Sequence, residues 1–92
     1  MNNLEKLKNL EQTGTLRIIS FLKSREGEKV RPSAIQKALD ISNDAYYSAR
    51  NRLIDLEVIE KIDDKYKTMS YFKLTTKGEK IAVFVYKLLE EL

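Results

Sequence analysis

The chain has 92 residues, with 17 Lys and Arg against 14 Asp and Glu, and it contains neither cysteine nor histidine. This length predicts a single domain with a thin core, and 42% hydrophobic with 34% charged residues indicates a folded, soluble protein. Without those two residue types there are no disulfides or thiolate metal sites, and the commonest general base and metal ligand is missing. We therefore expect no enzyme, no metal site and no cofactor. The formal charge of +3 cannot identify a nucleic-acid binder by itself.

Neither end of the sequence shows a targeting or membrane signal. The amino-terminal stretch MNNLEKLKNLEQ lacks the apolar core of a signal peptide. The longest apolar-rich run, IAVFVYKLL at 81–89, is far shorter than the roughly 20 residues that span a bilayer. We expect a cytoplasmic protein that does not enter a membrane.

The first third of the chain predicts two helices separated at Gly14. Residues 1–12 form a short amphipathic segment, because three leucines recur there at helical spacing: Leu4, Leu7 and Leu10. A second helix begins at Thr15 and ends at Gly27, where a polar stretch contains the glycine that terminates many helices. Its apolar stripe consists of Leu16, Ile19, Phe21 and Leu22.

Residues 30–56 predict two further helices joined by a tight turn. Pro32 makes the stretch from Val30 to Ser33 an extended entry, and a short helix follows over 34–39. We expect its inward residues to be Ala34, Ile35, Ala38 and Leu39. After the turn, Ser42 is a good N-cap for a longer helix over about 43–56. One face of that helix is apolar: Tyr46, Ala49, Leu53 and Leu56.

A β-hairpin and a last helix complete the predicted order. Residues 58–62 and 71–74 read as two strands around a polar turn. Thr76 and Glu79 match a capping box, which predicts a helix from there to the carboxyl end. Helices, a tight turn, a hairpin and a closing helix in this order predict a winged helix-turn-helix, mainly α with a small β-hairpin (α+β).

Three stretches resemble the winged helix-turn-helix transcription regulators, particularly small archaeal and bacterial proteins related to the MarR and PadR groups. LIDLEVIEK at 53–61 resembles the family's L-x-x-L-G-L-I-x-x end of the recognition helix, and LTTKG at 74–78 resembles its L-T-x-x-G. Ser42 and the apolar face after it resemble the family's capped recognition helix. The match covers residues 15–80. It departs at Glu57, where the family usually has the glycine that relieves a left-handed cap, so we expect mild strain or a different exit from the helix.

The resemblance implies one DNA-binding domain over residues 1–92, with the helix about 43–56 in the major groove and the wing about 59–74 on the flanking backbone. On the outward face of that helix, Asn51 can pair with adenine, and Arg50 with guanine or phosphate. The exposed aromatic Tyr47 has no core role to explain it. The alternative is an ordinary solvated helix face. The candidate DNA contacts are Ser42, Asn43, Asp44, Tyr47, Ser48, Arg50, Asn51 and Arg52, the wing-tip residues Lys65, Tyr66 and Lys67, and Lys29, Arg31 and Lys37.

The last helix is apolar around almost its whole circumference, which a domain of this size cannot cover. We expect a homodimer formed by residues 1–12 and 77–92; the alternative is a monomer in which the first segment covers the last helix. Val85, Leu88 and Leu92 are predicted to face outward, and Ile81 and Phe84 inward. The candidate interface residues are Leu4, Leu7, Val85, Leu88, Leu89 and Leu92.

The sequence therefore predicts a dimeric regulator that binds specific sites on double-stranded DNA. The rival interpretation is a winged-helix module that uses the same face or the wing to bind a protein. Acidic residues near the candidate surface favour that rival: Asp44, Asp55, Glu57, Asp63 and Asp64. Nothing in the sequence specifies an effector ligand.

Overall fold

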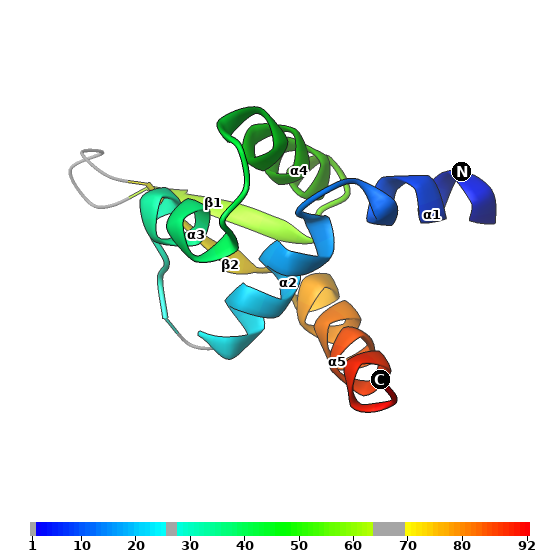
Figure 1. Cartoon of the computed structure of the whole chain (residues 1–92). Coiled ribbons are helices and arrows are strands. Elements are labelled where there is room, and N and C mark those ends of the chain that lie inside the picture. Colours follow the sequence, from blue (N-terminus) through cyan, green and yellow to red (C-terminus); the bar gives the residue numbers. More distant parts are fainter. Residues whose placement is uncertain (1, 26–27, 64–69) are drawn as a thin grey trace.

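The computed structural model describes residues 2–25, 28–63 and 70–92 (Figure 1). The predicted order is confirmed, and the fold is an α+β winged helix. In chain order the elements are α1 (Asn3–Glu11), α2 (Thr15–Ser24), α3 (Pro32–Leu39), α4 (Asn43–Asp55), β1 (Ile59–Asp63), β2 (Ser70–Leu74) and α5 (Thr76–Glu90).

Helix α2 lies at the centre of the molecule and contacts α1, α3, α4, α5 and β2 (Figure 1). The strands form an antiparallel pair in which Ile59 lies opposite Leu74, and Val30 adds a single bridge to Phe72. In β2 the alternate residues Phe72 and Leu74 are buried, as expected for a hairpin with one covered face, whereas in β1 only Ile59 is buried. The buried apolar residues are Ile18, Ile19, Leu22, Val30, Ile35, Leu39, Tyr46, Ala49, Leu53, Val58, Ile59, Phe72, Leu74 and Ala82.

Several local predictions are wrong in detail. Helix α2 ends at Ser24 with Arg25 as its cap, before Gly27, which lies outside the described residues. Ala34 and Ala38 are exposed, because Ile35 and Leu39 alone form the inward row of the short α3. Leu16 is also exposed, since the inward stripe of α2 is centred on other residues, which are Thr15, Ile18, Ile19 and Leu22.

The cap of α5 is Thr75 and not Thr76. Thr75 has an extended backbone, and its hydroxyl accepts the backbone N–H of Gly78 at 2.9 Å. The residue three positions after the cap is therefore a glycine, which has no side chain to return a bond. The predicted capping box with Glu79 does not form, and only the threonine half of the motif operates.

Helix α4 ends in a left-handed corner at Glu57, whose φ is 61°. The N–H of Val58 bonds the carbonyl of Leu53 at 2.9 Å, and the N–H of Glu57 bonds that of Ile54 at 2.9 Å. These two bonds define a Schellman motif, in which glycine normally occupies the left-handed position. The expected departure at Glu57 is therefore resolved: the helix leaves through the usual corner, and Glu57 takes the strained conformation. Val58, predicted as the start of the strand, belongs to this corner.

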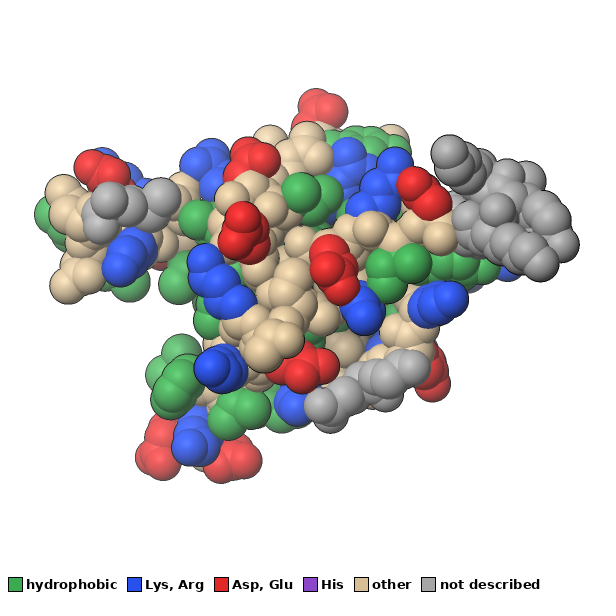
Figure 2. Space-filling view, turned by 180° about the vertical axis from the view of Figure 1, so that it is seen from behind, with side chains coloured by type: hydrophobic (Ala, Val, Ile, Leu, Met, Phe, Trp, Pro, Cys, Tyr) green, Lys and Arg blue, Asp and Glu red, His purple; other side chains and the backbone are tan. Residues whose placement is uncertain are grey.

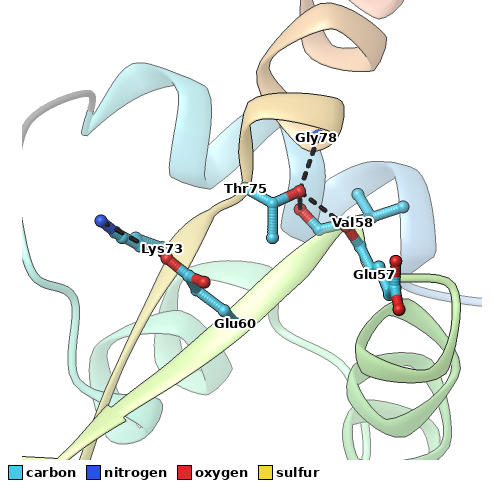
Figure 3. Close-up of polar contacts among 6 residues, drawn as sticks. All are labelled: Glu57, Val58, Glu60, Lys73, Thr75 and Gly78. Atoms are coloured by element: carbon cyan, nitrogen blue, oxygen red, sulfur yellow. Dashed lines mark hydrogen bonds and ion pairs between the residues drawn. The ribbon is translucent and has the colours of Figure 1, made fainter.

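The first turn of α5 binds the carbonyl groups of this corner (Figure 3). The Thr75 hydroxyl donates to the Glu57 carbonyl at 2.6 Å, and the Thr75 N–H donates to the Val58 carbonyl at 3.0 Å. Lys77 Nζ donates to the carbonyl of Leu56 at 2.7 Å. Gly78 lies so close that a Cβ there would be 1.9 Å from the Val58 carbonyl oxygen. Only glycine allows this contact, so the L-T-x-x-G pattern joins α5 to the end of α4.

We expect Glu57→Gly to stabilise the fold by about 0.5–1 kcal/mol, because glycine adopts positive φ without the clash that a Cβ causes. Urea unfolding followed by far-UV circular dichroism measures the difference. Glu57→Ala is the matched control, since it removes the same charge from the helix end but keeps the Cβ. Equal stabilisation by both variants would assign the effect to charge and contradict the backbone explanation.

Candidate nucleic-acid interface

Helix α4 is held by close packing against the turn before α2. Gly14 has a φ of 96°, and a Cβ on it would lie 2.8 Å from Ile41 Cδ1 and 3.3 Å from Ala49 Cβ. The inward face of α4 then packs Tyr46, Ala49 and Leu53 into the core, as predicted, while Leu56 is only half-buried. The helix is therefore fixed in position, and its opposite face is directed away from the core.

The start of α4 follows the predicted cap. The turn after α3 passes through Asp40 with a left-handed φ of 52°. Ser42 is extended, and its hydroxyl accepts the N–H of Ala45 at 3.2 Å, so the predicted N-cap is confirmed. Asn43 Oδ1 accepts a hydrogen bond from the side-chain amide of Gln36, which ties the start of α4 to α3.

The residues predicted on the outward face of α4 are exposed. Tyr47 keeps 47% of its surface accessible. Arg50 is half-buried on the flank. The other exposed residues of this face are Asn43, Asp44, Ser48, Asn51 and Asp55. In Figure 1 the helix lies on the side of the molecule away from α5, so this face is not covered by the rest of the described chain.

A cluster of aromatic rings surrounds the guanidinium of Arg50. Its Cζ lies 4.6 Å from the ring centroid of Tyr47, 5.8 Å from that of Phe72 and 5.9 Å from that of Tyr46. The two tyrosine rings meet edge to face with centroids 5.1 Å apart. Cation–π attraction favours this placement of a guanidinium. Tyr47, which had no core role in the sequence, is therefore part of the surface that holds Arg50.

Asn51 is bonded to Arg50. Its Oδ1 accepts from Arg50 Nε at 3.2 Å and from Nη2 at 2.9 Å. The predicted pairing of Asn51 with adenine requires this same oxygen as an acceptor. This contact could not be predicted from the sequence, because neighbours on a helix normally diverge by about 100° and reach each other only through long side chains.

Arg52 is directed toward the amino-terminal segment. Its Nη1 donates to Asn9 Oδ1 at 2.6 Å and its Nε donates to Gln12 Oε1 at 3.1 Å. Among its described contacts, this arginine links α4 to α1 and the residue that follows it. Its predicted contact with DNA would compete with these two bonds.

The remaining candidates lie outside α4. Arg31 is the N-cap residue of α3 and Lys37 lies in the last turn of that helix, and both are exposed. Lys29 Nζ lies 6.0 Å from the ring of Tyr71 on β2. The predicted wing-tip contacts, Lys65, Tyr66 and Lys67, lie outside the described residues. No group of acidic residues in the described part of the chain is arranged to hold a metal ion.

The hydroxyl of Tyr46 is buried and makes no hydrogen bond of normal geometry with the described residues. Burial raises the pKa of Tyr46 above its ordinary value of 10.0, and the positive charge of Arg50 and its hydrogen-bonding interaction with the hydroxyl offset part of that increase. The ring therefore contributes to the core of α4, while the hydroxyl has only this interaction with Arg50 in place of water.

The outer face of α5 is apolar and uncovered in the single chain. Phe84 is 69% exposed and Leu88 is 58% exposed, and Leu92 continues the same row. Val85 instead packs against the core beside Ile81. The predicted orientations of Phe84 and Val85 are thus reversed, because the inward row of α5 is set by Gly78 and Ala82, the two buried residues of the helix.

Other apolar residues extend this surface. Leu4 and Leu7 of α1 and Leu89 of α5 are exposed as well. In Figure 2 hydrophobic side chains gather at the lower left, over α5, while Lys and Arg alternate with Asp and Glu across the rest of the visible face. None of the helices in the described ranges is long and apolar enough to cross a bilayer.

Comparisons with known proteins identify the fold. No protein-family model and no curated protein matches the sequence. The chain is similar to a possible HxlR family transcriptional factor from Thermoplasma volcanium, with a TM-score of 0.84 and 22% identity over 99% of this chain and 82% of that chain. A protein described as a MarR family regulator from Porphyromonas gingivalis has a TM-score of 0.78 and 18% identity, over 95% and 84% of the two chains.

A third similar structure is the S. aureus MepR–DNA complex, with a TM-score of 0.75 and 18% identity over 96% of this chain and 75% of that chain. This chain spans 64% of the length of the MepR chain in each of two further S. aureus MepR structures. The resemblance seen in the sequence is therefore confirmed at the level of the fold: the chain has the winged-helix architecture of MarR- and HxlR-type regulators.

We expect Tyr46→Phe to leave stability unchanged or to raise it by up to about 1 kcal/mol, because it removes a buried hydroxyl that makes no hydrogen bond of normal geometry. Urea unfolding at neutral pH measures this. Destabilisation by the substitution would show instead that the hydroxyl has a partner in solution.

The same variant tests the raised pKa. A tyrosine whose folded pKa exceeds its unfolded value contributes stability that is present below pH 10 and declines as the pH rises beyond it. The wild-type chain should therefore lose more stability above pH 10 than Tyr46→Phe does. Tyr47→Phe, at an exposed ring, is the control for the loss of a tyrosine.

Proposed function

We propose that this chain is a transcriptional regulator that binds specific sites on double-stranded DNA as a homodimer. Each protomer places α4 in a major groove, and the hairpin lies on the flanking phosphates. The observation that carries the proposal is the outward face of α4, a capped helix packed against the core, whose exposed side chains are mostly hydrogen-bonding groups with the half-buried Arg50 on their flank. A helix of this kind fits the major groove, where base edges present donors and acceptors.

The similar structures support this proposal. One of them is a MepR–DNA complex, and the others are named as transcriptional regulators. Because the formal charge is only +3, we expect phosphate contacts to come from a few well-placed cations rather than from a broad basic surface. Arg31 and Lys37 at the two ends of α3, and Lys29 just before it, are exposed cations that would supply such contacts.

The exposed apolar row on α5 supports the homodimer. The exposed row of Phe84, Leu88 and Leu92 is an apolar surface that a second copy would bury with the same row of its own. Leu4 and Leu7 on α1 add to the available apolar area. A dimer of this kind would present two copies of α4, and helix-turn-helix dimers place them about 34 Å apart, one turn of DNA.

Duplex binding measured by fluorescence anisotropy across a salt series tests the DNA-binding function. We expect affinity for DNA to fall steeply as salt rises, because phosphate contacts release counterions. Ser48→Glu, on the outward face of α4, should weaken binding by about tenfold or more, since a carboxylate there faces phosphates. Thr76→Glu is the control, because it adds the same charge at an exposed hydroxyl on α5.

The rival function, binding of a protein, predicts the opposite result. A winged helix that binds a protein through an apolar surface would show little duplex binding and little salt dependence. Equal effects of Ser48→Glu and Thr76→Glu on DNA binding would also contradict the proposal, because the loss would then follow net charge rather than the face of α4.

Leu88→Glu should convert the dimer to a monomer. The substitution places a charge in an apolar interface from both sides of the two-fold axis, and burying it unpaired is strongly unfavourable. Sedimentation equilibrium of the wild type, Leu88→Glu and the control Thr76→Glu measures the outcome. A wild-type chain that sediments as a monomer at tens of micromolar would overturn the dimer and the expectation of a palindromic site.

A further inference from the structure

The guanidinium of Arg50 is held by two neighbouring side chains of α4 in the structure without DNA. Asn51 Oδ1 accepts from its Nε at 3.2 Å and its Nη2 at 2.9 Å, which holds one edge of the group. Its Cζ lies over the ring of Tyr47, 4.6 Å from the ring centroid. Two hydrogen bonds together with a contact to an aromatic ring reduce the freedom of the guanidinium to rotate. This arginine is therefore more ordered than an exposed arginine usually is.

This arrangement leaves Asn51 without a free acceptor for a base. Pairing with adenine requires the side-chain oxygen to accept from N6 while the amide nitrogen donates to N7. Asn51 Oδ1 already accepts two N–H groups from Arg50, as many as a carbonyl oxygen has lone pairs to accept. These bonds involve a charged donor, so an adenine amino group would have to displace a stronger interaction than the one it offers.

Arg50 keeps the edge that guanine recognition needs. Asn51 occupies Nε and one N–H of Nη2. The bonds to Asn51 do not use the N–H groups of Nη1 or the second N–H of Nη2. Together they form the end-on fork of a guanidinium, which matches the O6 and N7 acceptors on the major-groove edge of guanine.

We propose that Arg50 reads a guanine through its Nη1–Nη2 edge and that Asn51 is a positioning residue that holds this arginine rather than a reader of adenine. The inference rests on the proposed function, because it requires α4 to lie in a major groove. It also explains Tyr47, which serves as the platform for the guanidinium. Fixing the side chain in the free protein removes an entropic cost from binding, which favours affinity for the one base that fits.

The test begins with selection of bound duplexes from random DNA by the wild-type chain. Binding is then measured on the best site and on each of its single base-pair variants for Arg50→Ala, Arg50→Lys, Asn51→Ala and Asn51→Asp. We expect one G·C pair whose replacement costs the wild type about tenfold or more in affinity. Arg50→Ala and Asn51→Ala should both lose the preference at that same pair, and the double substitution should lose no more than Arg50→Ala alone.

The two conservative variants separate positioning from packing. Asn51→Asp keeps an acceptor for Arg50, so it should retain the guanine preference while its added charge lowers affinity on every duplex. Arg50→Lys keeps the charge but lacks the fork, so it should bind DNA and lose the preference. Circular dichroism of each variant confirms that the fold is intact.

Three results would overturn the inference while leaving DNA binding in place. Asn51→Ala could relax preference at an A·T pair that Arg50→Ala leaves unchanged, which would make Asn51 a direct reader. Arg50→Ala could weaken all duplexes equally, which would make it a phosphate contact. Asn51→Ala could leave the guanine preference intact, which would remove its positioning role. Failure of the wild type to bind any duplex is a different result, because it would overturn the proposed function itself.

Discussion

The hydroxyl and the backbone N–H of Thr75 bind the carbonyl groups of the corner after α4, the missing side chain of Gly78 allows the close approach, and the rest of the fold depends on this junction (Figure 3). Four elements meet there: α4 ends, β1 begins, β2 ends and α5 begins. The last carbonyl groups of a helix have no partners within it, and here the N–H groups of Glu57 and Val58 bind two of them. The carbonyl groups of the corner that follows accept hydrogen bonds from Thr75 and Lys77. The same contacts fix the direction of α5, so α4 and α5 are joined through a few hydrogen bonds.

This junction gives the proposed function a mechanical basis. A dimer formed through α5 sets the separation of two α4 helices only if the angle between α4 and α5 is constant. The close approach of Gly78 to the Val58 carbonyl leaves no room for a slide between them, and α2 packs against both helices. Glu57 takes a strained left-handed conformation within the junction, which the surrounding bonds maintain.

The candidate surface also shows how neighbouring side chains change one another's chemistry. Taken separately, Asn51 is a candidate for pairing with adenine and Arg50 is a candidate contact for guanine or phosphate. Joined by two hydrogen bonds and placed on Tyr47, they become one unit, in which the bonds to Asn51 leave the Nη1–Nη2 edge unused. Arg52 is similarly engaged by Asn9 and Gln12, which makes the amino-terminal segment a neighbour of α4 as well as a candidate for dimerisation.

The sequence by itself determined the order of the elements, the cap at Ser42, the burial of Tyr46, Ala49 and Leu53, and the exposed face of α4. These features follow from local backbone chemistry and from the 3.6-residue period, which act over a few neighbouring residues. Only the tertiary structure decided that Thr75 rather than Thr76 caps α5, that Phe84 faces outward and Val85 inward, and that Arg50 occupies the acceptor of Asn51. Each of these depends on a contact or a rotamer that periodicity does not contain. Thr75 caps α5 because its hydroxyl also binds carbonyl groups 17 and 18 residues away. The close approach of Gly78 to Val58 sets the orientation of α5. The pairing of Arg50 with Asn51 depends on aromatic rings around Arg50 that include Phe72 from the hairpin.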